Sequence, residues 1–517
     1  MARLSFKPDA SFFRKIAIGA VGTRAIVADL AGYGHQVVEL ERGATDTKLW
    51  KDVKRKRVRI PDLVCQRCGQ RIESRAKTKA ELAMSHSTVE ARAWDFGMVD
   101  PDWIAFPVCE PGDEDSWSVG RLRSGSSYWH EREWVRWRIG GRINYFTVAA
   151  FRAVPYSKSS TKGVTEGSET AVSWGATFAN YPGVVESIAG RNLLIRPASG
   201  GRRLSRRIPP GQEILVAAGD AIETHQALGS VVVSLAADGL ACPGVLPEGQ
   251  IAHLLASRER TQRFTGIKLA RLRGEPEHRS VAEELASDDE EDVYVRLEAA
   301  SYLASTCGQS PRVLFGPYLA GTDPQNRLEA VIALAEAATA EAVELLSELL
   351  DDGDQPHFLR SAAAWGLGRI GDEAATSRLM RAFDDVNQAI REEALEHLAT
   401  LGAAATPILL EGLHAPSPDV AAGAAEALRQ QQPMDPDTVA RLVDELRSAA
   451  PSPWAVWLYG YLPRDQVAGA IADLQQTAPA LHYAVSLLWS FVESWIARRW
   501  EISPDGLPPR IGADHAV

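Results

Sequence analysis

The sequence predicts a multidomain protein with an N-terminal α/β domain, a central all-β module and a C-terminal α-solenoid. A chain of 517 residues exceeds the roughly 250–300 residues at which a single hydrophobic core stops growing. Short alternating runs fill the middle of the chain, and evenly spaced helical repeats fill its second half. We therefore divide the chain into residues 1–110, 111–250, 251–435 and 436–502, followed by a tail, 503–517, that we expect to be disordered.

The composition is that of an ordinary globular protein. Hydrophobic residues make up 45% and charged residues 24%, which excludes collagen-like and wholly disordered chains. No run of eighteen uncharged apolar residues occurs, so we expect no membrane span. The first residues lack a small-residue cleavage site after their short apolar run, so we expect no signal peptide. Five cysteines are few and odd in number, which predicts a reducing, cytoplasmic location rather than a disulfide scaffold.

Positive charge gathers at the N-terminus, although the whole chain has a formal net charge of −11. Residues 1–80 hold eighteen Lys and Arg but only eight Asp and Glu. A basic patch attracts phosphate backbones by releasing their counterions, so we expect the densest part to bind DNA; the alternative is a solvated strand edge. This basic stretch consists of Lys51, Lys54, Arg55, Lys56, Arg57 and Arg59.

The N-terminal region predicts a helix, a strand and then a hairpin. Apolar residues at helical spacing predict a helix over residues 11–33, which ends near two glycines. Alternating patterns predict strands over residues 35–41, 56–64 and 70–77. Acidic residues then fall on the two neighbouring strands of the hairpin.

This order resembles the PD-(D/E)XK, or restriction-endonuclease-like, nuclease fold. Pro61-Asp62 on one strand and Glu73 on the next carry the resemblance, followed by Arg75 and Lys77. The resemblance implies that Asp62 and Glu73 bind Mg²⁺, which would polarise a scissile phosphate and generate a hydroxide nucleophile. It also implies a DNA endonuclease of a bacterial restriction or phage-defence system.

One position departs from the family pattern. The family has a lysine two residues after the acid, where this chain has Arg75. Arginine cannot give up its proton, so Arg75 would only contact phosphate, and Lys77, on the same strand face, would replace the lysine. The alternative is a degenerate domain without catalysis.

The turn between the hairpin strands, Cys65-x-x-Cys68-Gly, is half of a zinc knuckle. A structural zinc requires four ligands. Two free thiols in a tight turn are the alternative. The remaining candidates are Cys109 as a third ligand and His86 or His130 as a fourth, whereas Cys242 and Cys307 fall in other predicted domains.

The middle of the chain is predicted to be an all-β module. Short alternating runs are separated by Gly, Pro and Ser, which is typical of repeated strands and turns. Residues 206–229 resemble the barrel-sandwich hairpins of lipoyl- and biotinyl-like domains. Because no lysine lies in that segment for modification, we expect a structural or docking role.

Repeats of about 31 residues define the second half of the chain. Each unit ends in a leucine with an alanine four residues earlier, and most carry an arginine seven residues earlier. Alanine permits close helix packing, and an aspartate before each arginine is suited to capping the second helix. The pattern over residues 265–435 resembles HEAT-like repeats of the phycobilin-lyase type, which implies a surface that binds protein or nucleic acid. The repeat arginines are Arg296, Arg327, Arg360 and Arg391.

Two functions follow from these patterns. The first is a DNA-acting protein, a Mg²⁺-dependent endonuclease whose solenoid binds a partner or more DNA. The second is a non-enzymatic scaffold in which a degenerate nuclease-like domain accompanies protein-binding repeats. Arg75 at the lysine position and the acidic remainder of the chain favour the second.

Overall fold

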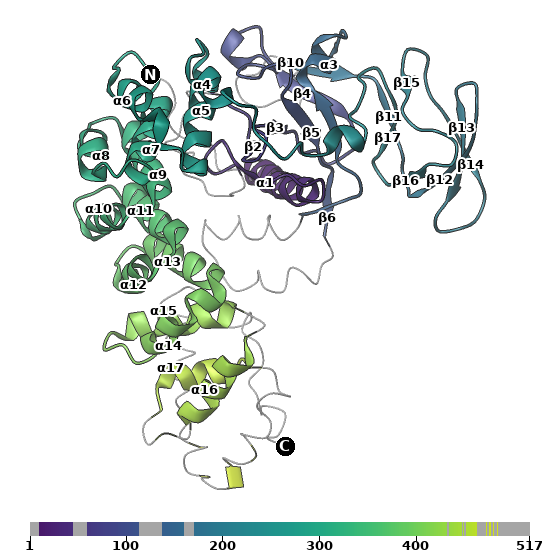
Figure 1. Cartoon of the computed structure of the whole chain (residues 1–517). Coiled ribbons are helices and arrows are strands. Elements are labelled where there is room, and N and C mark those ends of the chain that lie inside the picture. Colours follow the sequence, from purple (N-terminus) through teal and green to yellow (C-terminus); the bar gives the residue numbers. More distant parts are fainter. Residues whose placement is uncertain are drawn as a thin grey trace. The chain divides into compact units, whose positions relative to one another are not determined.

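The computed structural model describes residues 10–44, 59–112, 137–159, 170–431, 434–446, 448 and 451–462, with single positions as far as 483. The chain forms two compact units. The first consists of residues 1–117 and 129–306, and the second of residues 118–128 and 307–517. Figure 1 shows the elements of both. Among the described helices, none has the length and hydropathy that a membrane span requires.

The first unit is built on a five-stranded mixed sheet. Its first three strands form an antiparallel meander, the fourth runs parallel to the third, and the fifth is antiparallel to the fourth. The predicted helix and the strands predicted over 35–41 and 70–77 are observed in shorter form. The strand predicted over 56–64 is observed only from Leu63, so Asp62 lies just before it. Helix α1 spans Ala10–Ala31, and the sheet contains, in order, β1 (Val37–Glu39), β2 (Leu63–Cys65), β3 (Arg71–Ser74), β5 (Trp103–Phe106) and β8 (Asn144–Thr147).

Alternate residues of the sheet pack on opposite faces. Ile72 and Trp103 share a buried cluster with Ile26 of α1, so this helix covers one face. Ile104 belongs to a second cluster that includes Phe151. Because successive side chains of a strand point to opposite faces, the residues on either side of Ile72 in β3 face away from α1.

Smaller sheets contain the strands of the middle region. The described strands form open sheets, so the closed barrel-sandwich expected for residues 111–250 is not found among them. The module also shares strands with the N-terminal region, because β8 lies in the five-stranded sheet and β10 pairs with β4. The orders are β4 (Leu82–His86), β10 (Thr170–Trp174), β9 (Ser157–Ser159); β6 (Cys109–Pro111), β7 (Trp137–Ile139); β11 (Ala176–Phe178), β17 (Ala227–Ser230), β15 (Glu213–Ile214); and β14 (Leu204–Arg207), β13 (Asn192–Pro197), β12 (Gly183–Ala189), β16 (Ala221–Ile222).

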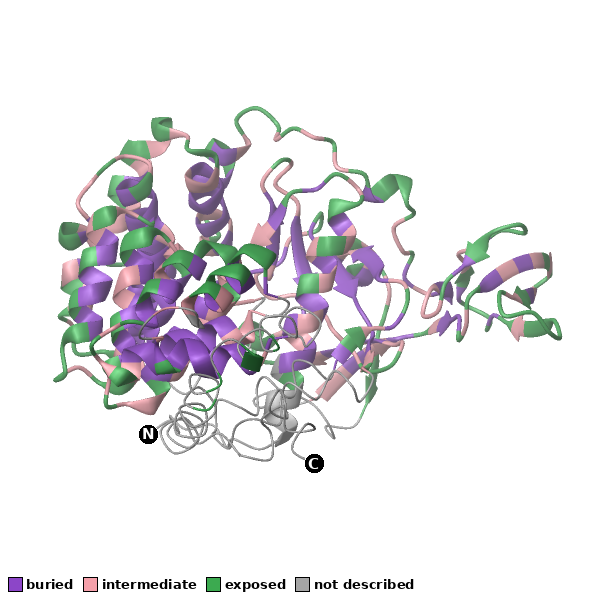
Figure 2. Cartoon of the chain, turned by 90° about the horizontal axis from the view of Figure 1, so that it is seen from below, coloured by how far each residue is buried: buried purple, intermediate pink, exposed green. Residues whose placement is uncertain are grey.

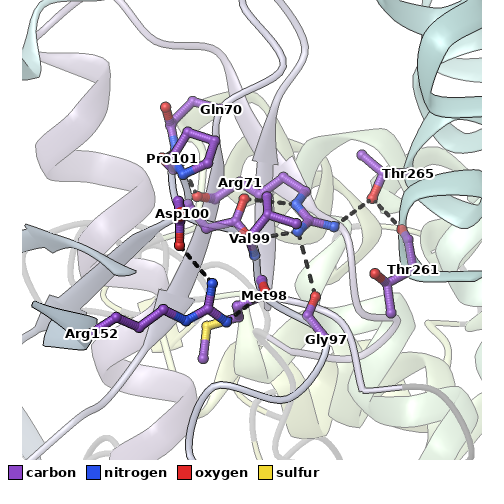
Figure 3. A network of polar contacts seen from close by, with 11 residues as sticks. Gln70, Arg71, Gly97, Met98, Val99, Asp100, Pro101, Arg152, Thr261 and Thr265 are labelled. Atoms are coloured by element: carbon purple, nitrogen blue, oxygen red, sulfur yellow. Dashed lines mark hydrogen bonds and ion pairs between the residues drawn. The ribbon is translucent and has the colours of Figure 1, made fainter. Parts of the chain in front are cut away.

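A buried arginine of the sheet contacts the first helices of the same unit. Arg71 of β3 donates to both carboxylate oxygens of Asp102, at 2.8 and 2.5 Å, and to the hydroxyl of Thr265 at 3.3 Å. Figure 3 shows its guanidinium directed at Thr265 and the Gly97 carbonyl. The helices of this unit are α3 (Val148–Arg152), α4 (Gln250–Leu255), α5 (Arg260–Arg273), α6 (Arg279–Ser287) and α7 (Val293–Ser305).

The second unit is a two-layer stack of helices. One layer contains α9, α11, α13, α15 and α17, each packed on the next, and α8, α10, α12 and α14 pack in series in the other. Figure 2 shows the helices buried along the faces that meet. The bounds are α8 Pro311–Leu319, α9 Pro324–Ala337, α10 Ala340–Asp351, α11 His357–Ile370, α12 Glu373–Arg381, α13 Gln388–Thr400, α14 Thr406–Gly412, α15 Pro418–Gln430, α16 Pro436–Leu446 and α17 Pro453–Tyr459.

The expected aspartate caps are observed at α7 of the first unit and at α9 of the second, whereas other residues occupy the N-caps of α11 and α13. Asp292 accepts the Tyr294 N–H at the start of α7, and Asp323 accepts the Gln325 N–H at the start of α9. The N-cap of α11 is Pro356 rather than the expected Asp354. Helix α13 is capped by Asn387, and α15 by Ser417.

Candidate functional site

Asp62 and Glu73 lie beside each other on the face of the sheet that α1 does not cover. Leu63 pairs with Ile72 in the β2–β3 ladder, and one further step of that register brings Asp62 opposite Glu73. The Asp62 carboxylate accepts the backbone N–H of Ser74 at 2.8 Å. The two acidic residues that the sequence singles out are therefore neighbours in the structure.

The carboxylate of Glu73 forms an ion pair with Arg75. Arg75 Nη2 lies 2.9 Å from Glu73 Oε1, and the two side chains are only 17% and 10% exposed. The same Nη2 donates to the Trp94 carbonyl at 3.2 Å, which holds the guanidinium in place. Glu73 is thus neutralised by the residue two positions further along its own strand.

A second arginine lies in this charged group. Arg59 donates from Nη1 to the Ala93 carbonyl at 2.8 Å. Burial and the neighbouring Arg75 lower the pKa of Arg59, whereas Glu73, Glu41 and Asp62 act to raise it. Two cations, Arg59 and Arg75, therefore act electrostatically on the acidic pair.

A glycine permits the close approach that holds Arg59. Gly97 adopts a φ of +80°, a left-handed backbone conformation that residues other than glycine rarely adopt. A Cβ atom at that position would lie 1.8 Å from the Arg59 carbonyl oxygen. The backbone of residues 93–97 therefore packs directly against the backbone of Arg59 and also accepts its side-chain hydrogen bond.

Lys77 lies just beyond β3 on an isolated parallel bridge to Val108. Its N–H donates to the Pro107 carbonyl at 2.9 Å, and its own carbonyl accepts the Cys109 N–H at 2.7 Å. Burial lowers the pKa of Lys77 to about 8, with Glu81 opposing and Arg75 adding to the shift. The ammonium is thus closer to neutrality than that of a solvated lysine.

Most of the predicted DNA-binding stretch lies outside the described residues. Lys51, Lys54, Arg55, Lys56 and Arg57 all fall in the gap between 44 and 59. Arg59 is the described member of the stretch, and its guanidinium faces the protein rather than solvent. A DNA-binding role for these residues remains a prediction.

Three cysteines and a histidine form a cluster in the first unit. The side-chain ligand atoms of His35, Cys65, Cys68 and Cys242 all lie within 4.8 Å of one another. His35 follows α1, the Cys65–Cys68 turn joins β2 to β3, and Cys242 follows the short 3-10 helix Asp238–Leu240. Three segments that are distant in the sequence therefore meet at the predicted half-knuckle.

The cluster favours a thiolate. Interaction with Cys68 lowers the pKa of the Cys65 thiol, although burial opposes it. The thiolate is the form of cysteine that binds metal, so these four residues can hold a metal ion.

The other residues considered as zinc ligands lie elsewhere or outside the described part. Cys109 is buried beside Ile18 and Trp137, and its thiol donates to the Ile18 carbonyl at 3.5 Å. Burial raises the pKa of Cys109 to about 12. His86 Nδ1 accepts the Trp94 N–H at 3.3 Å, and His130 is outside the described residues. The structure thus places His35 and Cys242, rather than Cys109, beside Cys65 and Cys68. In the sequence, Cys242 stands alone before Pro-Gly, and this is the only local sign of a ligand in a turn.

The repeat arginines of the second unit bind consecutive helix pairs together. Arg360 Nε donates to the Leu350 carbonyl at 2.8 Å, and its Nη2 pairs with Asp385 of the next repeat. Arg327 similarly donates to the Leu319 carbonyl at 2.9 Å and to Gln355 of the next repeat. Both arginines thus link one repeat to the next.

Two further arginines follow the pattern in part. Arg391 donates to the Asp385 carbonyl at 2.6 Å, and Arg296 pairs with the exposed Asp289 at 2.8 Å. In the first unit, Arg263 donates to the Ser257 carbonyl at 2.8 Å and to Glu291. The repeat pattern had not included Arg263, although it lies 33 residues before Arg296.

Comparison with known proteins identifies the repeats. Residues 314–399 match the family of HEAT repeats. No curated protein matches the chain. The complex of CpcE and CpcF of phycocyanin lyase from Nostoc is 22% identical, covering 41% of this chain and 94% of that chain, with a TM-score of 0.21.

Other solved structures are similar to a comparable degree. The YibA protein of Escherichia coli is 16% identical, covering 47% of this chain and 93% of that chain, with a TM-score of 0.25. Human deoxyhypusine hydroxylase is 19% identical, covering 46% of this chain and 87% of that chain, with a TM-score of 0.18. The chain therefore combines a strand-rich N-terminal region with a C-terminal helical solenoid that contains HEAT repeats.

Proposed function

We propose that this protein is a non-enzymatic scaffold, in which a degenerate nuclease-like domain accompanies HEAT-like repeats that bind a protein partner. The observation that carries the proposal is the 2.9 Å ion pair between Glu73 and Arg75, largely withdrawn from water. The nuclease fold would require the Glu73 carboxylate for a metal ion. In this chain the Glu73 carboxylate instead forms an ion pair with Arg75.

The electrostatics of the acidic pair oppose a divalent ion. Mg²⁺ binds through one or two carboxylates and keeps several waters. At Glu73 it would have to displace Arg75 or lie beside it, and like charges repel strongly where water is excluded. Arg59 adds a second fixed cation on the same side. Arg75 cannot relieve this repulsion by losing its proton.

The charge of the solenoid favours a protein partner over nucleic acid. Residues 307–462 contain 23 acidic residues, ten arginines and no lysine, a net charge of −13. Several of the arginines are engaged within the stack. Such a surface repels phosphate backbones and attracts basic protein surfaces. Stacked helix pairs offer an extended face for that contact.

A DNA endonuclease is the second candidate, and one contact favours it. The bond from the Ser74 N–H to Asp62 sets this carboxylate beside Glu73, the juxtaposition that a metal-dependent nuclease needs. Lys77, whose pKa is lowered to about 8, would then supply the missing amine. This candidate requires Mg²⁺ to compete with Arg75.

A cleavage assay separates the two candidates. The full-length protein is incubated with linear, nicked and single-stranded DNA in the presence of Mg²⁺ or Mn²⁺, beside Asp62→Ala. The scaffold proposal predicts equal background from both proteins. Metal-dependent cutting by the unchanged chain that Asp62→Ala abolishes would establish the nuclease.

Partner capture tests the scaffold directly. Immobilised full-length protein is exposed to an extract of its own cells with and without prior digestion of the nucleic acids. A protein partner that the solenoid binds should be retained equally in both cases, and it should elute as salt is raised. Retention that disappears on digestion would show that nucleic acid mediates the contact and would contradict the proposal.

A further inference from the structure

We propose that His35, Cys65, Cys68 and Cys242 together bind one Zn²⁺ ion with a structural role. The proposal rests on the geometry of the four side chains, on the orientation of the histidine and on a backbone hydrogen bond to one of the sulfurs. It is independent of the proposed scaffold function, because it would hold equally for a nuclease.

The spacing of the four ligand atoms fits a tetrahedral zinc. With bonds of about 2.3 Å to sulfur and about 2.0 Å to nitrogen, neighbouring ligand atoms lie roughly 3.5–3.8 Å apart. Cys65 Sγ is 4.0 Å from Cys242 Sγ, and Cys68 Sγ is 3.6 Å from His35 Nδ1. All four atoms lie within 4.8 Å of one another. Shifts of up to about 1 Å would complete the coordination.

The histidine is oriented as a metal ligand. His35 Nε2 lies 2.9 Å from the Leu240 carbonyl oxygen. Because that oxygen can only accept a hydrogen bond, the contact fixes the tautomer with Nε2–H. The lone pair of Nδ1 is then directed at Cys68. The indole of Trp103 packs edge-on against the buried imidazole, with the ring centroids 5.4 Å apart. Metal-bound histidines are usually fixed by such a second hydrogen bond.

A backbone N–H group points at one of the sulfurs, as such groups do around a thiolate. The Gly244 N–H donates to Cys242 Sγ at 3.4 Å. Such a bond stabilises negative charge on the sulfur.

The segments that carry the ligands are also joined without a metal. The Cys242 N–H donates to the Tyr33 carbonyl at 2.9 Å, and the Gln66 N–H donates to the Gln36 carbonyl at 2.9 Å. Arg67 in the cysteine turn donates to the Gly34 carbonyl at 2.9 Å. The site is therefore largely formed in advance, and a metal would fasten segment 240–244 to the β2–β3 turn and to the end of α1.

The ligand set selects zinc and a structural role. Three soft thiolates and one imidazole suit Zn²⁺ rather than Mg²⁺ or Ca²⁺, which prefer oxygen. Four protein ligands leave no position for water or substrate, as in structural zinc sites. Cys65 and His35 are buried, and the other two ligands are partly buried.

The direct test is metal analysis and zinc X-ray absorption spectroscopy of the full-length protein purified under reducing conditions. We expect about one equivalent of zinc, bound by three sulfurs at about 2.3 Å and one nitrogen at about 2.0 Å. Less than half an equivalent after zinc has been supplied, or a shell made mainly of oxygen, would overturn the proposal. A Cys65–Cys68 or Cys65–Cys242 disulfide in protein that was purified under reducing conditions and supplied with zinc would also overturn the proposal.

Paired variants assign the ligands. Cys242→Ser should lose most of the zinc, whereas Cys109→Ala, which removes a buried thiol outside the cluster, should keep it. Equal zinc in Cys242→Ser and the unchanged protein would contradict the ligand set. Because Cys242→Ser can fail to fold, hydrogen exchange of the unchanged protein with and without a zinc chelator is the second measurement. Chelation should expose peptides covering residues 238–246 and the β2–β3 turn, and unchanged protection there would contradict a structural role.

Discussion

Arg75 Nη2 makes two contacts, one with Glu73 Oε1 at 2.9 Å and one with the Trp94 carbonyl at 3.2 Å. Removing one partner of a mostly buried ion pair leaves the other charge without compensation, which costs more than the pair itself contributes. Both contacts come from the same nitrogen, and the guanidinium that carries it stays charged at any pH at which the protein is folded. The arginine therefore gives the acidic pair a structural partner.

Replacing Arg75 tests this structural role. Arg75→Met should lower the free energy of unfolding by about 2 kcal/mol, because Glu73 is left charged and poorly solvated. The double variant Glu73→Gln/Arg75→Met should recover most of that loss. Urea unfolding followed by tryptophan fluorescence measures both. An Arg75→Met protein as stable as the unchanged chain would mean that the ion pair has no structural role.

Lys77 should make stability depend on pH. Its pKa is about 8 in the folded protein and 10.5 ordinarily, so the unfolded chain holds more protons between those values and stability rises with pH across that window. Below pH 8 the full cost of burying the charge is present. Lys77→Met should therefore be more stable by about 3 kcal/mol at pH 7, since the pKa shift from 10.5 to about 8 corresponds to about 1.4 kcal/mol per unit.

The advantage of Lys77→Met should shrink from pH 8 upward and disappear near 10.5. Lys79→Met is the matched control, since that side chain is 74% exposed. Its stability should differ little from the unchanged chain at any pH. Urea midpoints across the range measure the difference, and a gain independent of pH would rule out titration of Lys77 as its cause.

Single residues also show what the sequence left hidden. The spacing Cys65-x-x-Cys68 is local and marks half of a metal site. His35 and Cys242 are distant from it along the chain, and only the folding of the sheet brings them near. No spacing rule connects positions 35 and 242, so the full set emerges from the tertiary structure.

At the scale of elements, the helical repeats were the most predictable part. A fixed interval of alanine and leucine reflects helices that meet their neighbours in the same way each time. The repeated arginine is explained in the same way: at Arg360 the side chain donates to the carbonyl at the end of the preceding helix and to the next repeat. Caps were less predictable, since several polar residues precede each helix and local geometry selects one; at α11 Pro356 takes the place of Asp354.

Arg360 offers a test of the linkage between repeats. Arg360→Met removes its contacts with the Leu350 carbonyl and Asp385, so α11 and α13 should lose protection from hydrogen exchange by an amount on the order of 2 kcal/mol. Arg378→Met is the matched control, because its pair with Asp351 is long, at 3.7 Å, and solvent-exposed. Equal protection in the two variants would contradict the linkage.

At the scale of the whole molecule, the alternation of strands and helices indicated the classes of structure but not how the strands are shared. Residues 144–147 were assigned to the middle module, yet β8 completes the N-terminal sheet. Strand β10 likewise pairs with β4 across a long stretch of chain. Periodicity reports which face of a strand is buried, whereas pairing depends on contacts between distant segments.

The central claim is that Arg75 takes the place of a metal ion at the acidic pair. The most direct measurement is a Mn²⁺ titration of the full-length, zinc-supplied protein, followed by electron paramagnetic resonance and compared with Asp62→Ala. Our account predicts the same weak, nonspecific uptake by both proteins. One tightly bound Mn²⁺ that Asp62→Ala eliminates would contradict it and restore the nuclease.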